Sequence, residues 1–220
     1  MAQDTQHRRG RYAEGIRNDQ LLLDAARDVF ASQGASASVA AVAVRAGLGI
    51  GSLYRRYGSK SELLQHLCVL AMEQSIAAAN YALASSDATQ ALIAYIRACV
   101  GLRTGALGPL AGTIQVTAEM WALARKGRRL HNRIVARAHR EGHLRRDVTA
   151  LDVAWMIEQF GRTAPAADAD DADHVVHQRL LAIAIDGLYA SCAAALPGQP
   201  PSSAHYAQRW ATRQHSDTAG

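Results

Sequence analysis

VAVRAGLGIGSLYRRYGSKSELL, residues 42–64, is the stretch of the sequence that decides the fold. It contains the end of one short helix, a turn and a second helix of about two turns. Small Ala43 lets the two helices cross closely, Gly47 can take the positive φ that the turn requires, and Leu53 fills the crossing. This small–glycine–apolar spacing predicts a helix-turn-helix that runs from Ser38, its N-cap, to Tyr57.

One helix before this motif completes a compact three-helix unit. Its apolar residues fall on one helical stripe, and Gly34 stands where a left-handed C-cap would end it. The stripe consists of Leu22, Ala25, Ala26, Val29 and Phe30. The three helices are therefore predicted at residues 20–33, 39–46 and 50–57. After the motif, Ser59–Glu62 is typical of a capping box and predicts the start of a further helix.

The second helix of the motif carries a polar surface that suits DNA. Its hydroxyl and guanidinium groups can contact phosphates or base edges in a major groove about 12 Å wide. These side chains are Ser52, Tyr54, Arg55, Arg56 and Tyr57, with Lys60 just beyond the helix. The residues alone leave two alternatives open, namely that the tyrosines are core aromatics and that the arginine pair is an ordinary solvated face.

Residues 16–66 resemble the DNA-binding domain of the tetracycline-repressor (TetR) family of transcriptional regulators. The resemblance is carried by AARDVFASQG at residues 25–34, by VRAGLGIGSLYRRY at residues 44–57, and by Lys60 with Glu62–Leu64. It implies an all-α protein in which an N-terminal helix-turn-helix domain precedes a variable C-terminal helical domain. That second domain is expected to bind a small effector and to form a homodimer.

The resemblance also assigns DNA contacts by position. It implies that Ser52 and Arg56 reach base edges or nearby phosphates, with support from Arg45 and Arg55. The side chains expected to hold the phosphate backbone are Tyr54, Tyr57, Lys60 and Ser38. Ala40 and Ala41 depart from the family, whose second helix is often polar on its exposed face.

The rest of the chain is predicted to form longer helices, which brings the expected total to about nine. They are placed at residues 88–103, 110–125, 128–142, 150–162 and 174–196, after the helix that Ser59 caps. We find no strand signal and no internal repeat. The expected segments are a flexible basic arm at 1–15, the helix-turn-helix domain at 16–62, an effector-binding and dimerisation domain at 63–196, and a disordered tail at 197–220.

Two features of the C-terminal helices bear on function. The last two helices carry more apolar residues than one core needs, which predicts a four-helix dimer interface. The resemblance implies an effector cavity, and large or soft side chains on the middle helices are the candidates for its lining, although ordinary core packing is the alternative for each. The candidates are Tyr95, Met120, Trp121, Trp155, Met156 and Phe160.

Charge alone does not locate a nucleic-acid surface. The chain has a formal net charge of +5, and its densest basic run lies in residues 120–150 rather than in the motif. Apolar residues recur at helical spacing within that run, so a solvated helix face is expected there. No metal site is expected, because His131, His139 and His143 lack a carboxylate or thiol on their face. The acidic stretch 168–173 lacks the glycine and glutamate of a calcium loop and is expected to be a solvated linker.

Together with what the resemblance implies, the sequence therefore predicts a cytoplasmic, ligand-controlled repressor of a palindromic operator. No enzyme is expected and no cofactor, since no catalytic constellation is present and GLGIGS at residues 47–52 lacks the strand and Gly-Lys-Ser/Thr of a phosphate loop. The beginning of the chain does not look like a secretory signal, no membrane span is expected, and three scattered cysteines suit a reduced compartment. A non-specific DNA-packaging protein and an activator remain the alternatives.

Overall fold

Helices make up the computed structural model, which describes residues 2–110, 112–142, 144–166, 168–189, 194–202 and 204. No strand occurs among these residues. The elements are α1 (Ala2–Gln33), η1 (Gly34–Ser36, a 3₁₀ helix), α2 (Val39–Arg45), α3 (Ile50–Tyr57), α4 (Lys60–Ala84), α5 (Ala88–Gly101), η2 (Thr104–Leu110, also 3₁₀), α6 (Ala118–Arg140), α7 (Ala150–Thr163) and α8 (Asp171–Gly187). The predicted all-α fold class is confirmed.

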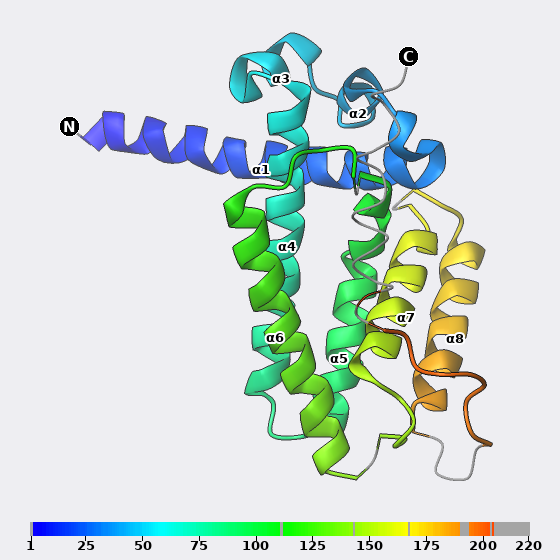
Figure 1. Ribbon diagram of the computed structural model, residues 1–220. Helices are drawn as coiled ribbons and strands as arrows, with labels where there is room; N and C mark the ends of the chain where they lie inside the picture. The colour runs from blue at the N-terminus through cyan, green and yellow to red at the C-terminus, as the bar shows by residue number, and fades with distance from the viewer. Residues whose placement is uncertain are drawn as a thin grey trace.

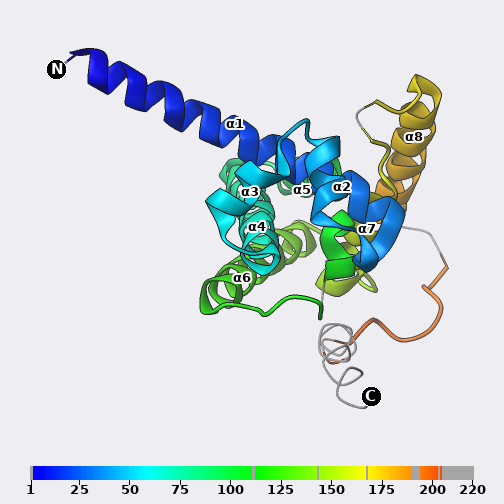
Figure 2. The ribbon, with the colours of Figure 1, turned by 90° about the horizontal axis from the view of Figure 1, so that it is seen from above.

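The two short helices of the motif lie together at one end of the molecule (Figure 1). α1 crosses beneath them, and its N-terminal part projects beyond the body (Figures 1 and 2). Below α1, the helices α4, α5 and α6 run along the length of the body, with α7 beside them. Seen from above, α8 and α6 lie on opposite sides of the molecule (Figure 2). This arrangement leaves α3 at the outer end and α8 at an outer side.

Two predictions for the helices before α7 are wrong. The first helix begins at Ala2 rather than at residue 20, and it ends at Gln33 where Gly34, with φ 70°, follows as predicted. The helices expected at 110–125 and 128–142 form a single α6, so the described residues hold eight α-helices rather than nine. Gly127 does not break α6 because it faces α4, where a Cβ would lie 3.8 Å from Ile76 Cγ1. Tertiary packing overrides the low helix propensity of glycine at this position.

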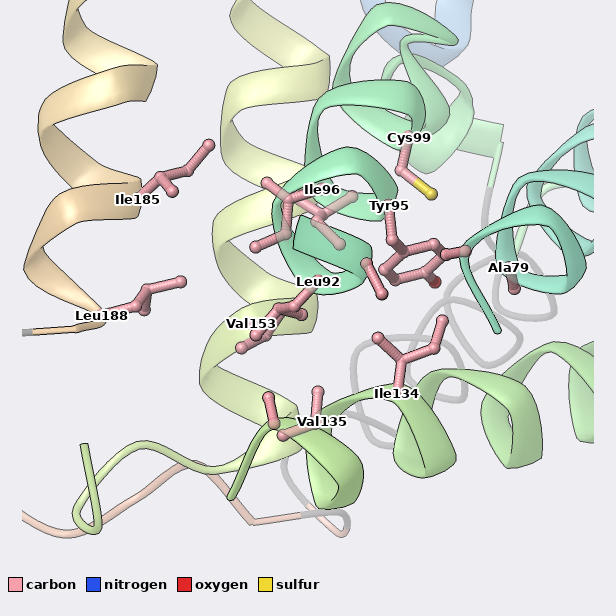
Figure 3. Packing of buried hydrophobic residues seen from close by; sticks show 14 of the residues in the cluster. Ala79, Leu92, Tyr95, Ile96, Cys99, Ile134, Val135, Val153, Ile185 and Leu188 are labelled. Carbon is pink, nitrogen blue, oxygen red and sulfur yellow. The ribbon is translucent and has the colours of Figure 1, made fainter. Parts of the chain in front are cut away.

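The buried apolar side chains form two clusters, and α4 contributes to both. The N-terminal cluster joins α1, α2 and α3 to the first turns of α4, and it includes Leu22, Phe30, Val42, Leu53, Leu64 and Leu67. The C-terminal cluster surrounds α5, which places Leu92, Tyr95 and Ile96 among side chains from α4, α6, α7 and α8 (Figure 3). Further along, α4 adds Ile76, Ala79 and Ala82 to this second cluster. The two halves of the molecule are thus packed on one continuous helix.

α4 is long and apolar enough to cross a membrane by length and composition. Its buried face nevertheless packs against α1, α5 and α6. The apolar composition of α4 is therefore accounted for by its place in both hydrophobic clusters, as for the core helix of a globular protein.

The C-terminal elements follow the sequence less closely, since α8 ends at Gly187 and the helix predicted there was expected to reach residue 196. α8 begins three residues earlier than expected, because the Asp170 carboxylate accepts a hydrogen bond from the Ala172 N–H at 3.0 Å and caps the helix. The predicted basic helix face is confirmed, since Leu130, Ile134 and Val135 of α6 are buried. Most of the tail predicted at 197–220 lies outside the described residues, as do His143 and Cys192.

Candidate DNA-binding site

The helix-turn-helix geometry is built as its sequence spacing predicts. Ser38 caps α2, and its hydroxyl accepts a hydrogen bond from the Ala41 N–H at 3.1 Å. Ala43 is buried between the helices, and Gly47 has a φ of 67° in the turn. Leu53 of α3 is 5% exposed and belongs to the cluster that holds α2 and α3 against α1. These contacts fix the angle at which α3 is presented.

One part of α3 faces solvent and carries polar groups. Ser52, Tyr54 and Arg55 are exposed, and Tyr54 keeps 44% of its surface accessible. The Arg55 guanidinium donates to the Ser52 hydroxyl at 3.1 Å, so the two side chains lie together on this surface. For Tyr54, the core alternative raised from the sequence is wrong because the ring is exposed.

The last two residues of α3 are turned back toward α1. The Tyr57 hydroxyl donates to Asp19 Oδ1 at 2.5 Å, and Arg56 Nη2 donates to Asp19 Oδ2 at 2.8 Å. Tyr57 is 8% exposed, which makes it the core aromatic that one sequence alternative described. Burial is the largest cause that raises the pKa of the Tyr57 phenol well above its ordinary value, and the neighbouring Asp19 raises it further. Tyr57 therefore stays a neutral hydrogen-bond donor.

Arg45 is also directed at other parts of the protein. Its Nε donates to Asp28 Oδ2 on α1 at 2.9 Å, and its two terminal nitrogens pair with the Asp168 carboxylate at 2.8 and 2.6 Å. Asp28 in turn is paired with Arg103, at the end of α5. Arg45 holds the pKa of the Asp168 carboxyl below its ordinary value. Asp168, expected in a solvated linker, thus ties the segment before α8 to the helix-turn-helix.

Lys60 lies at the start of α4 beside the motif. Its ammonium group is 3.5 Å from the Ala37 carbonyl oxygen, and the residue is exposed. Ser59 caps α4 by accepting a hydrogen bond from the Glu62 N–H at 3.2 Å, as the sequence predicts. The exposed polar groups of Ser38, α3 and Lys60 therefore belong to the unit that sits at one end of the molecule (Figure 1).

The six candidates for an effector cavity do not gather in one place. Met120 belongs to the N-terminal cluster, and Trp121 is 52% exposed. Tyr95 lies in the C-terminal cluster, and Met156 and Phe160 pack against it. The sixth, Trp155, is half-buried on α7. Only the C-terminal cluster brings several of these residues together.

A buried polar contact lies within the C-terminal cluster. His131 Nε2 is 2.6 Å from the Ala150 carbonyl oxygen, and Nδ1 is 3.3 Å from the Tyr95 hydroxyl. Burial lowers the pKa of the His131 imidazole, so the ring is neutral and donates from Nε2 to the carbonyl. His139 lies against the Val148 carbonyl instead, at 2.9 Å. Within the described part of the chain, no three His, Cys, Asp or Glu side chains are grouped to hold a metal ion.

The sequence reasoning missed three carboxylates that hold these basic side chains. Asp19, Asp28 and Asp168 lie far along the chain from the arginines that they contact. No local signal marks them, because i,i+3 and i,i+4 patterns report only neighbours on one helix. The capping residue Thr117, whose hydroxyl accepts from the Met120 N–H at 3.2 Å, was also missed, although its residue type and place before α6 could have shown it.

Two profiles of known protein families match the chain, one in its N-terminal part and one in its C-terminal part. The profile described as "Bacterial regulatory proteins, tetR family" matches residues 22–67, which hold the helix-turn-helix. The profile of the C-terminal domain of SbtR-like transcriptional regulators matches residues 87–190. None of the curated proteins compared matches the sequence.

Solved structures share the fold over most of the chain. LfrR, a TetR-like regulator from Mycobacterium smegmatis in complex with proflavine, is 21% identical with a TM-score of 0.57, and covers 82% of this chain and 99% of its own. SCO0520 from Streptomyces coelicolor is 20% identical, with a TM-score of 0.54 and coverage of 79% and 99%. A regulator from Mycobacterium vanbaalenii is 22% identical, with a TM-score of 0.53 and coverage of 81% and 98%. At this level of identity the likeness establishes the fold.

Proposed function

Because the chain belongs to the tetR family of bacterial transcriptional regulators, we propose that it is a cytoplasmic, homodimeric repressor that leaves a palindromic operator when a small-molecule effector binds. As a member of that family it is a DNA-binding regulator and not an enzyme. The sign of regulation, the dimer interface and the control by an effector are the parts that this proposal adds.

The observation that carries the proposal is the exposed polar face of α3. Ser52, Tyr54 and Arg55 extend from a helix whose angle is fixed by Ala43 and Leu53 in the buried cluster. A helix presented in this way fits a major groove, where hydroxyl and guanidinium groups contact phosphates and base edges. Because α3 is only two turns long, one copy reads few base pairs, and a second copy at fixed spacing is needed for a specific site.

An apolar strip on α8 supports dimerisation through the last helices. Val175, Val176, Leu180 and Ile183 are between 52% and 63% exposed, and their spacing places them on one side of the helix. Four large apolar side chains on one exposed helix face are typical of an interaction surface. α8 also lies at the outer side of the molecule, where a second copy can reach it (Figure 2). Together with α7 it would form the four-helix interface that the sequence predicts.

The effector is proposed to act on the C-terminal domain. LfrR, which shares the fold, was solved with proflavine bound, which supports a small-molecule ligand for this chain as well. Such a ligand can release DNA only if it binds one spacing of the two α3 helices more tightly than the other. The Arg45–Asp168 pair is a physical connection through which the α7–α8 segment can influence α2.

The proposal is tested by selecting bound duplexes from a random-sequence library with the full-length protein. The expected product is a palindrome bound about a thousandfold or more tightly than scrambled DNA at physiological salt. Tyr54→Ala is expected to weaken operator binding. The matched control is Tyr81→Ala, which removes an equally bulky and more exposed tyrosine from α4. Nearly uniform affinity for all duplexes would favour a non-specific DNA-packaging protein and would contradict the proposal.

A further inference from the structure

Asp19 of α1 holds two consecutive residues of the DNA-reading helix with one carboxylate. Oδ1 accepts from the Tyr57 hydroxyl at 2.5 Å, and Oδ2 accepts from Arg56 Nη2 at 2.8 Å. The Asp19 side chain is only 14% exposed, so this hold lies at the edge of the N-terminal cluster rather than in open solvent. A charge-assisted hydrogen bond in a partly buried place is stronger than one at a fully exposed surface.

These bonds are the polar attachment of α3 to the rest of the protein. In the part of the chain that the structure describes, every side-chain hydrogen bond from α3 to another helix ends on α1, at Asp19 or at the Gly15 carbonyl. The N-cap residue Gly49 offers no side chain to fix the other end of α3. Leu53 and the Tyr57 ring pack the helix down, but apolar contacts fix its rotation about its own axis less sharply than directional bonds do.

The Arg56 guanidinium is paired with Asp19 by these contacts, although its side chain remains 42% exposed. It lies 5.1 Å from the centre of the Tyr57 ring, and Nη1 is 3.5 Å from the Gly15 carbonyl oxygen. His66 of α4 completes the surroundings of Asp19, with Nε2 3.5 Å from Oδ2 and its ring 5.2 Å from that of Tyr57. Both arginines are exposed, but the positive charge of Arg56 is paired with the Asp19 carboxylate, whereas Arg55 contacts the neutral Ser52 hydroxyl.

From this arrangement we propose that Asp19 is a positioning residue that sets DNA specificity by orienting α3 and by withholding the Arg56 charge from phosphates. The inference rests on the proposed function, because it concerns how the operator is distinguished from other DNA. Phosphate contacts strengthen binding to every sequence alike, whereas base contacts depend on the orientation of the reading helix. A carboxylate that fixes the orientation and also neutralises a cation raises the ratio of specific to non-specific binding.

The test compares Asp19→Asn with Asp24→Asn, the same change five residues further along α1. Among the described residues, the Asp24 carboxylate bonds only Gln20 and Arg27 of its own helix, so the control removes an equal charge without touching α3. Affinities for the selected operator and for a scrambled duplex are measured at several salt concentrations. For Asp19→Asn we expect scrambled DNA to be bound about fivefold to tenfold more tightly at 0.1 M salt, with a salt dependence steeper by about one released counterion. Operator affinity is expected not to rise with it, so the ratio of operator to scrambled affinity falls.

Tyr57→Phe separates orientation from charge and covers the case in which Asp19→Asn fails to fold. It removes one of the two bonds to Asp19 and leaves every charge in place. Operator affinity is expected to fall several-fold, with the salt dependence unchanged and scrambled DNA bound as before. If Asp19→Asn binds operator and scrambled DNA as Asp24→Asn does, the inference is overturned while the repressor proposal stands. If Asp19→Asn is unfolded, the same conclusion follows when Tyr57→Phe binds both duplexes as the unmodified protein does. If the unmodified protein prefers no sequence, the proposed function itself has failed.

Discussion

At the scale of single residues, His131 shows how burial determines chemistry. The imidazole lies between the Tyr95 hydroxyl and the Ala150 carbonyl inside the C-terminal cluster. The chief cause of its lowered pKa is desolvation, because burial disfavours the charged ring. In the unfolded chain the same group titrates at its ordinary value near 6.5.

We therefore expect the protein to lose stability as the pH falls below about 6.5. Between that value and the lower pKa of the folded state, the unfolded chain binds a proton that the folded chain does not, so acid favours unfolding. The stability contribution of neutral His131 is complete above pH 6.5 and decreases as the pH falls toward the folded pKa. The Tm of the unmodified protein and of His131→Gln, measured from pH 8 to pH 5, checks this.

The matched control for this titration is His139→Gln on the same helix, where the imidazole is only partly buried. His131→Gln is expected to flatten the acid limb of the Tm curve relative to both the unmodified protein and the control. Parallel curves for all three proteins would show that His131 does not contribute to the acid sensitivity.

Burial also determines the reactivity of the two described cysteines. It raises the pKa of the Cys68 and Cys99 thiols to about 12 each, so neither is ionised at neutral pH. Since the thiolate is the reactive form, we expect both to resist alkylation by iodoacetamide at pH 7.5 in the folded protein and to react once it is unfolded in guanidinium chloride. Rapid modification of either cysteine in the native state, located by mass spectrometry, would contradict this.

At the scale of elements, η2 and α7 bring their backbones close together at two glycines. Gly105 lies against the backbone of Glu158, where an added Cβ would stand 2.1 Å from the carbonyl oxygen. On the facing helix, Gly161 would place a Cβ 3.2 Å from the Gly105 nitrogen. The sequence predicts only a connection between the helices expected at 88–103 and 110–125 here, because nothing local shows that another helix passes so near.

Gly105→Ala is expected to destabilise the protein by about 1–3 kcal/mol or more, because the methyl group meets backbone that must move. The urea midpoint should fall with little change in the slope of the unfolding transition. Gly101→Ala is the control, since nothing lies within 4 Å of its added Cβ. Equal midpoints for the two variants would show that η2 and α7 can separate without cost.

Elements were predictable from the sequence where their signals are local. The caps at Ser38 and Ser59 and the turn at Gly47 depend on neighbouring residues, and the helices that they delimit were placed within a residue or two. Gly127 was misread as a break, because its environment against Ile76 is set by a helix about fifty residues away in the chain.

The candidate site divides in the same way into residues that local signals predict and residues that they do not. The exposure of Tyr54 fits the local pattern, whereas the hold of Asp19 on Arg56 depends on tertiary contacts.

At the scale of the whole molecule, the exposed strip on α8 predicts how DNA binding depends on assembly. Leu180→Glu places a charge in the middle of that strip and is expected to shift the protein from dimer to monomer, because a buried unpaired carboxylate is costly. Operator affinity should fall with it, since the two half-sites no longer bind together. Light scattering after size-exclusion chromatography measures the mass, and operator titration measures the affinity.

The control is Gln178→Glu, which adds the same charge on α8 at an exposed position away from the strip. It should leave both the mass and the affinity unchanged. If Leu180→Glu remains a dimer, then the interface lies elsewhere on the molecule, and α8 is not part of it.

The N-terminal cluster has a consequence for the order in which the protein is made. Its apolar set is not confined to the first helices, because Leu107, Leu110, Ile114 and Met120 pack into it from beyond α5. When Leu67 has been synthesised, about fifty residues must still be added before that set is present, which takes several seconds at ~5–20 residues per second. During that interval the N-terminal cluster against which α3 packs is incomplete. The growing polypeptide should therefore become able to bind an operator only after the residues up to Met120 have left the ribosome.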